Sequence, residues 1–158
     1  MSTSAEIQVS SRLEASASDV WARVTTPEGI NDEMRPWLRM TTPAGVERLD
    51  LSAITPGEPI GRSWILLFGA IPFDYDDITL VWIEEGRGFL ERSQMLSQRL
   101  WEHERTIEAG DGWCVLTDRV RWEPRLGVPA RPLKPVISRF FGHRHRRLRR
   151  RFGGAEVS

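Results

Sequence analysis

The sequence LWEHERTIE at residues 100–108 alternates as a β-strand with one buried face does. Alternation places Trp101, His103, Arg105 and Ile107 on one face and a polar, largely acidic set of side chains on the other. We expect the acidic face to contact solvent and the first face to point inward. Polar groups on an inward face need buried partners or a ligand. These nine residues therefore predict both a sheet and a polar site on its inner side.

A second strand-like stretch, residues 113–123, contains TDRV at 117–120 and follows the first after a Gly-Asp-Gly turn. Such a turn pairs two strands antiparallel. The more apolar face of the second stretch carries Asp118, so we expect Asp118 beside His103 and Arg105. Two interpretations follow: Arg105 could anchor a ligand carboxylate and His103 a hydroxyl or carbonyl, or Arg105 and Asp118 could form an internal pair beside a histidine. We favour the internal pair, because a buried charge is tolerated only when it is paired.

The rest of the chain predicts more strands, two short helices and one long helix. Residues 6–15 alternate as an edge strand. Ser16 or Ser18 can cap a helix that includes Asp19, and Pro27 opens a second helix that runs to about Met34. Further strands, separated by turn residues, are expected at 45–54, 62–71, 73–83, 88–96, 100–108 and 113–123.

The long helix is expected at residues 133–152, ended by Gly153-Gly154. Its apolar stripe has Arg144 as one gap and should pack on the sheet through Val136, Ile137, Phe140, Phe141 and Leu148. A sheet with one solvated face needs an apolar cover on the other face, and this helix supplies it. A curved sheet around one helix would leave a cavity between them.

Size and composition bound the class of protein. We expect one domain over residues 1–158, because 158 residues with 40% hydrophobic content suffice for one core. The single cysteine, Cys114, cannot form an internal disulfide, which indicates a cytoplasmic location. The apolar run at 64–73 is too short to span a bilayer, and the first residues show no secretory signal.

Charge is segregated along the chain although the net charge is zero. Residues 131–158 contain nine basic residues and one acidic residue, and most of the basic ones fall at 144–151. Such a stretch could bind nucleic acid or an anionic membrane. It lacks the interleaved aromatic residues of single-strand-binding proteins. We favour the interpretation that it is the solvated outer face of the helix.

Other site patterns fail. The cluster Asp74, Asp76 and Asp77 lacks the glycine and the distant glutamate of a calcium loop, so we expect a solvated turn. His143 and His145 diverge on a helix and have no cysteine at ligand spacing, so no metal is expected. No phosphate-binding loop or nucleophile elbow is present, and no cofactor is expected.

The order of these elements and motifs resembles the START-like helix-grip superfamily, also called SRPBCC. The resemblance rests on the order of SDVW at 18–21, WEHER at 101–105, TDRV at 117–120, and Phe141, Arg144 and Leu148 near the C-terminus. It is nearest to bacterial ligand-binding SRPBCC domain proteins and polyketide cyclase-like proteins. The resemblance implies an α+β fold, with a seven-stranded antiparallel sheet wrapped around the C-terminal helix and a hydrophobic cavity. The superfamily includes lipid carriers, hormone receptors and polyketide cyclases, so the fold does not determine the activity.

Three functions are considered. The first, which we favour, is binding or carriage of a small hydrophobic or amphipathic molecule without strong catalysis. Its candidate site residues are Trp37, Trp101, His103, Arg105 and Asp118; Trp37 follows Pro36 where this architecture has its cavity mouth. The second is a cyclase or dehydratase that uses His103 as general acid/base, oriented by Asp118. The third is an adaptor that binds nucleic acid or membrane through the basic helix.

Overall fold

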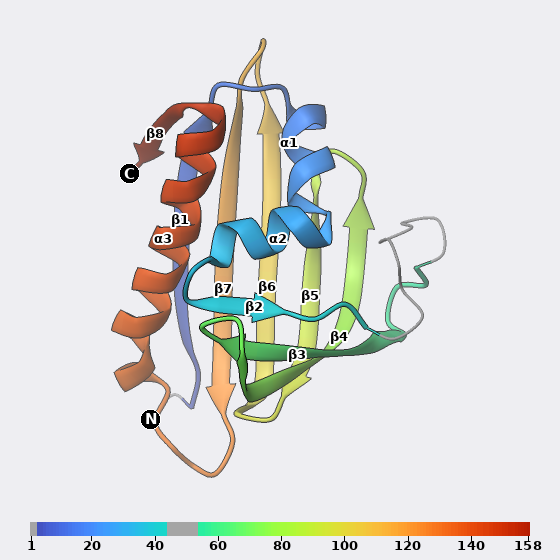
Figure 1. Cartoon of the computed structure of the whole chain (residues 1–158), viewed down its shortest axis with the longest axis vertical. Coiled ribbons are helices and arrows are strands. Elements are labelled where there is room, and N and C mark those ends of the chain that lie inside the picture. Colours follow the sequence, from blue (N-terminus) through green and yellow to red (C-terminus); the bar gives the residue numbers. More distant parts are fainter. Residues whose placement is uncertain (1–2, 44–53) are drawn as a thin grey trace.

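The computed structural model describes residues 3–43 and 54–158. They form an antiparallel sheet in the order β2-β3-β4-β5-β6-β7-β1-β8, with the helices on one side of it, here called the inner face (Figure 1). The elements are β1 (Ala5–Leu13), α1 (Ala17–Val24), α2 (Pro27–Met34), β2 (Leu38–Met40), β3 (Pro59–Leu67), β4 (Ile71–Glu84), β5 (Gly88–Met95), β6 (Gln98–Ala109), β7 (Cys114–Pro124), a 3-10 turn (Arg131–Leu133), α3 (Lys134–Phe152) and β8 (Gly154–Val157).

The helix-grip architecture and the order of most elements confirm the sequence prediction, but the strand count differs. The described residues form eight strands, of which β2 and β8 were not predicted. β2 has only three residues, too few for an alternating pattern to be recognised. The strand predicted at 45–54 lies outside the described residues except for its last position.

The C-terminal glycines end α3 as predicted and also start β8. Gly153 and Gly154 both have positive φ, 77° and 129°. A Cβ on Gly154 would lie 1.8 Å from the carbonyl oxygen of Arg12, so only glycine allows this close approach. The chain reverses here and pairs β8 with β1 from Ser10 to Leu13. The expectation that β1 is an edge strand was therefore wrong for this part of the strand.

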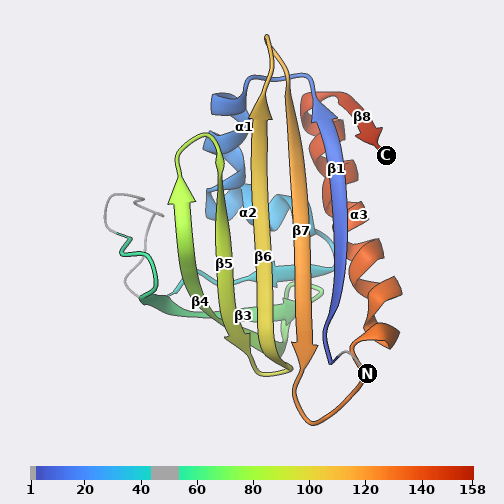
Figure 2. The ribbon, with the colours of Figure 1, turned by 180° about the vertical axis from the view of Figure 1, so that it is seen from behind.

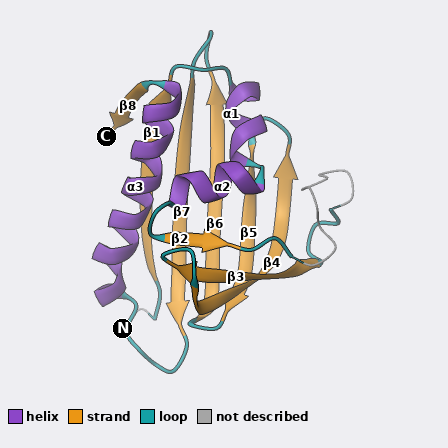
Figure 3. Ribbon diagram, viewed as in Figure 1, coloured by secondary structure: helices purple, strands orange, loops and turns teal. Residues whose placement is uncertain are grey.

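Both short helices begin at side-chain caps. Ser16, rather than Ser18, accepts a hydrogen bond from the backbone N–H of Asp19 at 3.2 Å, and Thr26 accepts one from Gly29 at 3.0 Å. α1 and α2 lie across the inner face, over the middle of the sheet (Figure 3).

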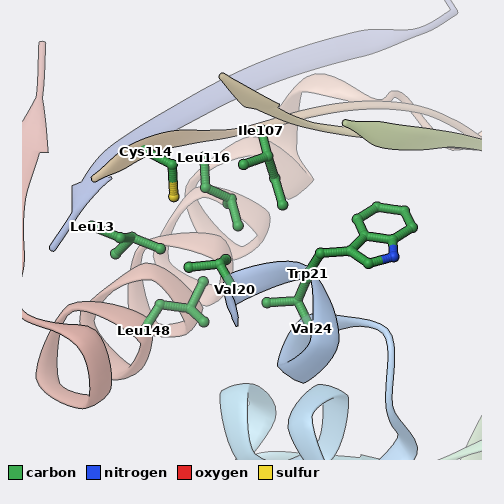
Figure 4. Packing of buried hydrophobic residues seen from close by; sticks show 8 residues of the cluster. All are labelled: Leu13, Val20, Trp21, Val24, Ile107, Cys114, Leu116 and Leu148. Atoms are coloured by element: carbon green, nitrogen blue, oxygen red, sulfur yellow. The ribbon is translucent and has the colours of Figure 1, made fainter. Parts of the chain in front are cut away.

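The larger core cluster lies where α1 and α3 meet the sheet. Figure 4 shows side chains of α1 pointing toward those of β1, β6, β7 and α3; the cluster comprises Leu13, Val20, Trp21, Val24, Ile107, Cys114, Leu116 and Leu148. A second cluster, with Trp122 and Phe141 at its centre, joins the first half of α3 to the other end of β7. The two clusters therefore hold α3 against the strands β1, β6 and β7.

The packing of α3 departs from its predicted apolar stripe. Phe141 and Leu148 are buried, as expected, and Ile137 and Phe140 are half-buried. Val136 is 65% exposed, so its predicted contact with the sheet is wrong. The first turns of α3 border a cavity on the face that carries Val136, while Phe141 packs on the sheet.

The outer face of the sheet carries the predicted polar residues. No helix lies over strands β4, β5, β6, β7 and β1 when the molecule is seen from behind (Figure 2). Glu102 accepts hydrogen bonds there from Arg92 (2.9 Å) and Arg121 (3.1 Å). This confirms the predicted alternation of β6. Among the described residues, no helix is long and apolar enough to cross a membrane.

Candidate ligand-binding cavity

A cavity of about 1210 Å³ lies between the inner face of the sheet and the helices. Its wall is mainly apolar: Met34 and Trp37 border it at α2 and the following loop, Leu80 and Phe89 on the sheet, and Phe140 and Phe141 on α3. Typical sites for small molecules enclose about 300–1,000 Å³ with a few placed polar groups. This cavity is large enough for such a ligand. Its polar wall residues fall into two groups.

The first polar group is centred on Arg105 of β6 and Asp118 of β7, which stand directly opposite each other in the register. Arg105 donates to Asp118 from Nε and Nη2, each at 2.7 Å. It also donates to both carboxylate oxygens of Glu33 on α2, at 3.0 and 2.8 Å. The Arg105 residue is 1% exposed, and four of its five guanidinium N–H groups donate to these two carboxylates.

These contacts hold both partners in their charged forms. Burial by itself would lower the pKa of Arg105, but the negative charges of Asp118 and Glu33 outweigh it and raise that pKa. Burial would likewise raise the pKa of Asp118, but Arg105 and then His103 hold it well below its usual range. Asp118 is therefore a carboxylate and accepts every hydrogen bond that it makes.

Two histidines complete the surroundings of Asp118. His103 Nε2 donates to Asp118 Oδ1 at 2.7 Å, and His145 Nε2 on α3 donates to Oδ2 at 2.9 Å. The other nitrogen of His145 lies 2.8 Å from the hydroxyl of Ser11, whose oxygen accepts from Arg149 at 2.8 Å. This pattern is satisfied when the Ser11 hydroxyl donates to Nδ1 of a neutral His145.

Arg144 balances the remaining charge. Its Nε donates to Glu33 at 3.2 Å from α3. Two guanidinium groups, Arg105 and Arg144, thus face two carboxylates, Glu33 and Asp118. Of the two interpretations that the sequence left open, the internal pair is present, extended to a network that joins α2, α3, β1, β6 and β7.

The comparisons with known proteins agree with this architecture. A family model described as "Domain of unknown function (DUF8410)" matches residues 11–152. The chain belongs to this family. No protein with a curated description matches the chain in sequence.

Several solved structures are similar in fold to this DUF8410 member. A START superfamily protein from Mycobacterium smegmatis is 13% identical, with a TM-score of 0.65 over 93% of this chain and 96% of that one. CalU16 from Micromonospora echinospora is 15% identical, with a TM-score of 0.59 over 94% and 74%. DynU16, from the dynemicin biosynthetic locus, is 20% identical, with a TM-score of 0.57 over 94% of this chain and 48% of that protein. The fold is therefore START-like.

The predicted site residues of the DUF8410 member mostly reach the cavity. Trp37, Trp101, His103 and Arg105 line it, whereas Asp118 lies behind the last two. Trp37 is 49% exposed, and its ring centroid lies 6.3 Å from that of His143. The His103 ring packs edge-on between Phe89 at 5.5 Å and Phe141 at 5.2 Å. His103 thus places a polar ring of the first network in an apolar part of the cavity wall.

Sequence reasoning missed Glu33, Arg144 and His145. A signal was present for two of them: Arg144 and His145 follow Phe141 by three and four residues and so share its helix face. Both belong to the basic stretch that was assigned to the solvated outer face, although Arg144 had also been recognised as the one gap in the apolar stripe. In the structure Arg147 also turns inward and bonds to Asp32, at 3.0 Å to its carboxylate. The outward residues at 144–151 are Arg146, Arg150 and Arg151.

The second polar group, the carboxyl cluster, consists of Asp74 and Asp76 on β4 and Glu91 on β5. All three are buried and line the cavity, so the expected solvated turn was wrong for both aspartates. Only Asp77 lies on the outer face, where Arg62 Nε donates to it at 2.8 Å. The error arose because the acidic cluster was read as a turn, whereas it occupies alternating positions within a long strand.

Proposed function

We propose that this protein binds or carries a small, largely apolar molecule in the cavity between the sheet and α3. The observation that carries the proposal is the 1210 Å³ cavity with its mainly apolar wall. Burial of apolar ligand surface would supply most of the affinity, at about 25 cal/mol per Å² before the costs of association. Trp37 at the rim and Trp101 on the sheet are the proposed apolar contacts.

His103 is the proposed orienting group at the network end of the cavity. Asp118 fixes the ring by accepting from Nε2, which leaves Nδ1 as the ring nitrogen able to accept a hydrogen bond. Arg105 lines the wall, but four of its five N–H donors bind Asp118 and Glu33, which already balance its charge. A ligand carboxylate would therefore gain little at Arg105, and a neutral hydroxyl is favoured at this end. The single cysteine, Cys114, is free and buried, in keeping with the proposed cytoplasmic location.

Binding can be tested with N-phenyl-1-naphthylamine, a neutral probe whose fluorescence rises in an apolar site. We expect a saturable rise with the wild-type protein. The variant Ile137→Trp, which adds bulk on the cavity wall, should abolish it, whereas Glu104→Trp on the outer face adds the same side chain and should not. Native mass spectrometry of freshly purified protein would test for a molecule that copurifies. A flat titration with probe and with a panel of fatty acids and phenols would overturn the proposal.

An enzymatic function is a second candidate, favoured by the His103–Asp118 pair at the cavity wall. A histidine held by a carboxylate on an adjacent strand can remove a proton next to a ligand carbonyl. Incubation of the protein with polyketide-like phenols and ketones, followed by mass spectrometry, would test it. Product formation that is lost in His103→Asn, with probe binding retained, would support catalysis.

A further inference from the structure

The carboxyl cluster lies on the wall of the cavity beside the first network. Glu91 stands opposite His103 in the register of β5 and β6, and Asp76 stands opposite Met95 in that of β4 and β5. Asp76 is 3% exposed. The cluster thus places three carboxyl groups on the inner face within a largely apolar wall.

Unlike the first network, the carboxyl cluster has no cationic partner among the described residues. Glu33 and Asp118 each pair with guanidinium groups, but within residues 3–43 and 54–158 no arginine, lysine or histidine forms an ion pair with Asp74, Asp76 or Glu91. A buried and unpaired carboxylate is costly, so such a group either holds a proton or meets a cation.

Two buried acceptor atoms at this end of the cavity lack a donor. Asp76 Oδ1 has no hydrogen-bond partner among the described residues, and neither has Gln98 Oε1. The Gln98 orientation follows from its neighbours: the Ser97 hydroxyl donates to Asp74, so its oxygen accepts from Gln98 Nε2 at 3.2 Å. Asp76 and Gln98 both line the cavity. Among the described residues, this part of the wall therefore presents two acceptor atoms that no donor reaches.

The hydroxyl and guanidinium donors nearest to these two atoms already have acceptors. The Ser63 hydroxyl, opposite Asp76 on β3, donates to the carbonyl of Thr41. The Ser93 hydroxyl donates to Glu91 at 2.9 Å. Arg125, which follows β7, donates to the carbonyl of Met95 at 2.8 Å. The missing donors must therefore come from outside these side chains.

We infer that the carboxyl cluster, with Gln98, is a subsite for a protonated amine carried by the ligand. This inference rests on the proposed binding function and adds the polar chemistry of the ligand. An ammonium group brings one positive charge and up to three N–H donors, which match carboxylate and amide oxygens. The charges of the first network cancel among themselves, whereas the carboxyl groups of the cluster form no ion pair with any described residue. The ligand class is therefore an amphipathic amine, with its apolar part against Trp101 and the phenylalanines.

The proton state of the empty subsite supports this chemistry. Burial, and then the negative charge of Glu91, raise the pKa of Asp76 well above its usual value. The charged or titratable groups around the pair are Asp74 on β4, His103 on β6 opposite Glu91, and Arg125 beyond β7. The raised pKa favours a proton on Asp76 in the empty cavity. A bound ammonium group would replace that proton and release it.

The test compares decylamine, decanol and decanoate as competitors of N-phenyl-1-naphthylamine at neutral pH. The three share an alkyl chain and differ in the head group, so the order of displacement reports the polar subsite. We expect decylamine to compete at a concentration about tenfold lower than decanol, since a charge-assisted hydrogen bond contributes about 1.5–3 kcal/mol. Decanoate should be the weakest.

Matched variants locate the preference. Asp76→Asn and Glu91→Gln should each remove most of the preference for decylamine over decanol. Asp77→Asn, one residue along on the outer face, should leave both unchanged. As a readout that needs no variant, calorimetry of decylamine binding in two buffers of different ionisation enthalpy should show proton release.

Each contrary outcome is distinct. Absence of probe binding to the wild type would overturn the binding function and this inference together. Probe binding with equal competition by amine and alcohol would overturn the inference alone. Amine binding without proton release, or an amine preference that survives in both cluster variants, would also overturn it.

Discussion

Arg105 on β6 donates two hydrogen bonds of 2.7 Å, from Nε and Nη2, to the carboxylate of Asp118 on the adjacent strand β7. The same guanidinium forms an ion pair with Glu33 on α2. One buried side chain thus ties the helix pair to the middle of the sheet. Its removal would leave two buried carboxylates without their principal cation.

The variant Arg105→Met should destabilise the fold by about 3–5 kcal/mol, because breaking a buried ion pair leaves uncompensated charge. Chemical denaturation measures the change. The control is Arg92→Met, which removes an exposed partner of Glu102 on the outer face and should cost less than about 1 kcal/mol. Equal effects of the two variants would show that the buried network adds no stability.

Asp76→Asn should stabilise the protein at pH 8 and have little effect near pH 4. The folded state raises the pKa of Asp76, so the native protein binds more protons than the unfolded chain above the ordinary aspartate pKa. Stability from this group is therefore present at low pH and lost as pH rises. Asparagine mimics the protonated carboxyl and removes the loss. Thermal unfolding from pH 4 to pH 8 measures it; parallel curves for the two proteins would contradict the assignment.

The contribution of Asp118 to stability should depend on pH in the opposite direction to that of Asp76. The folded-state pKa of Asp118 lies well below its ordinary value, so its contribution is complete above about pH 4 and is lost as pH falls from there through the folded-state pKa. Unfolding free energies between pH 5 and pH 2.5 should therefore fall steeply with acid. The Arg105→Met variant should show a shallower fall, since the main cause of the shift is gone.

Two adjacent phenylalanines of α3 should differ in their effect on stability. Phe141 is 1% exposed at the centre of a core cluster, and Phe141→Ala should cost about 3–5 kcal/mol. Phe140 is half-buried at the cavity wall, and Phe140→Ala should cost clearly less. Urea denaturation of both variants checks this order. A larger cost for Phe140 would show that α3 packs with a different face on the sheet.

Trp37 should contribute to ligand binding more than other exposed tryptophans do. Trp37→Ala should weaken binding of N-phenyl-1-naphthylamine by about fivefold, through loss of apolar contact at the rim. Trp64 is similarly exposed but packs on Tyr75, with ring centroids 5.6 Å apart, and does not line the cavity. Trp64→Ala is therefore the control and should bind the probe as the wild type does. Equal losses would point to general destabilisation.

The sequence by itself determined the local features of this protein. Alternation at 100–108 assigned His103 and Arg105 to the inner face, and the turn between β6 and β7 set the register that brings Asp118 opposite Arg105. Capping residues located the starts of both short helices. Each of these features depends on neighbours in the chain, through side-chain period, turn geometry or a hydrogen bond to the next turn, so sequence patterns report them directly.

Only the tertiary structure decided how the polar inner residues are satisfied. Glu33 comes from α2 and Arg144 from α3, and the side-chain period of one element does not show which other element will pack against it. Two buried aspartates differ in their partners: Asp118 pairs with Arg105, whereas one carboxyl oxygen of Asp76 has no hydrogen-bond partner among the described residues. A buried charge is stabilised by partners that the fold brings from distant segments. For that reason the chain's pattern could indicate a polar site, but the packing of α2 and α3 on the sheet determined which polar groups remain for a ligand.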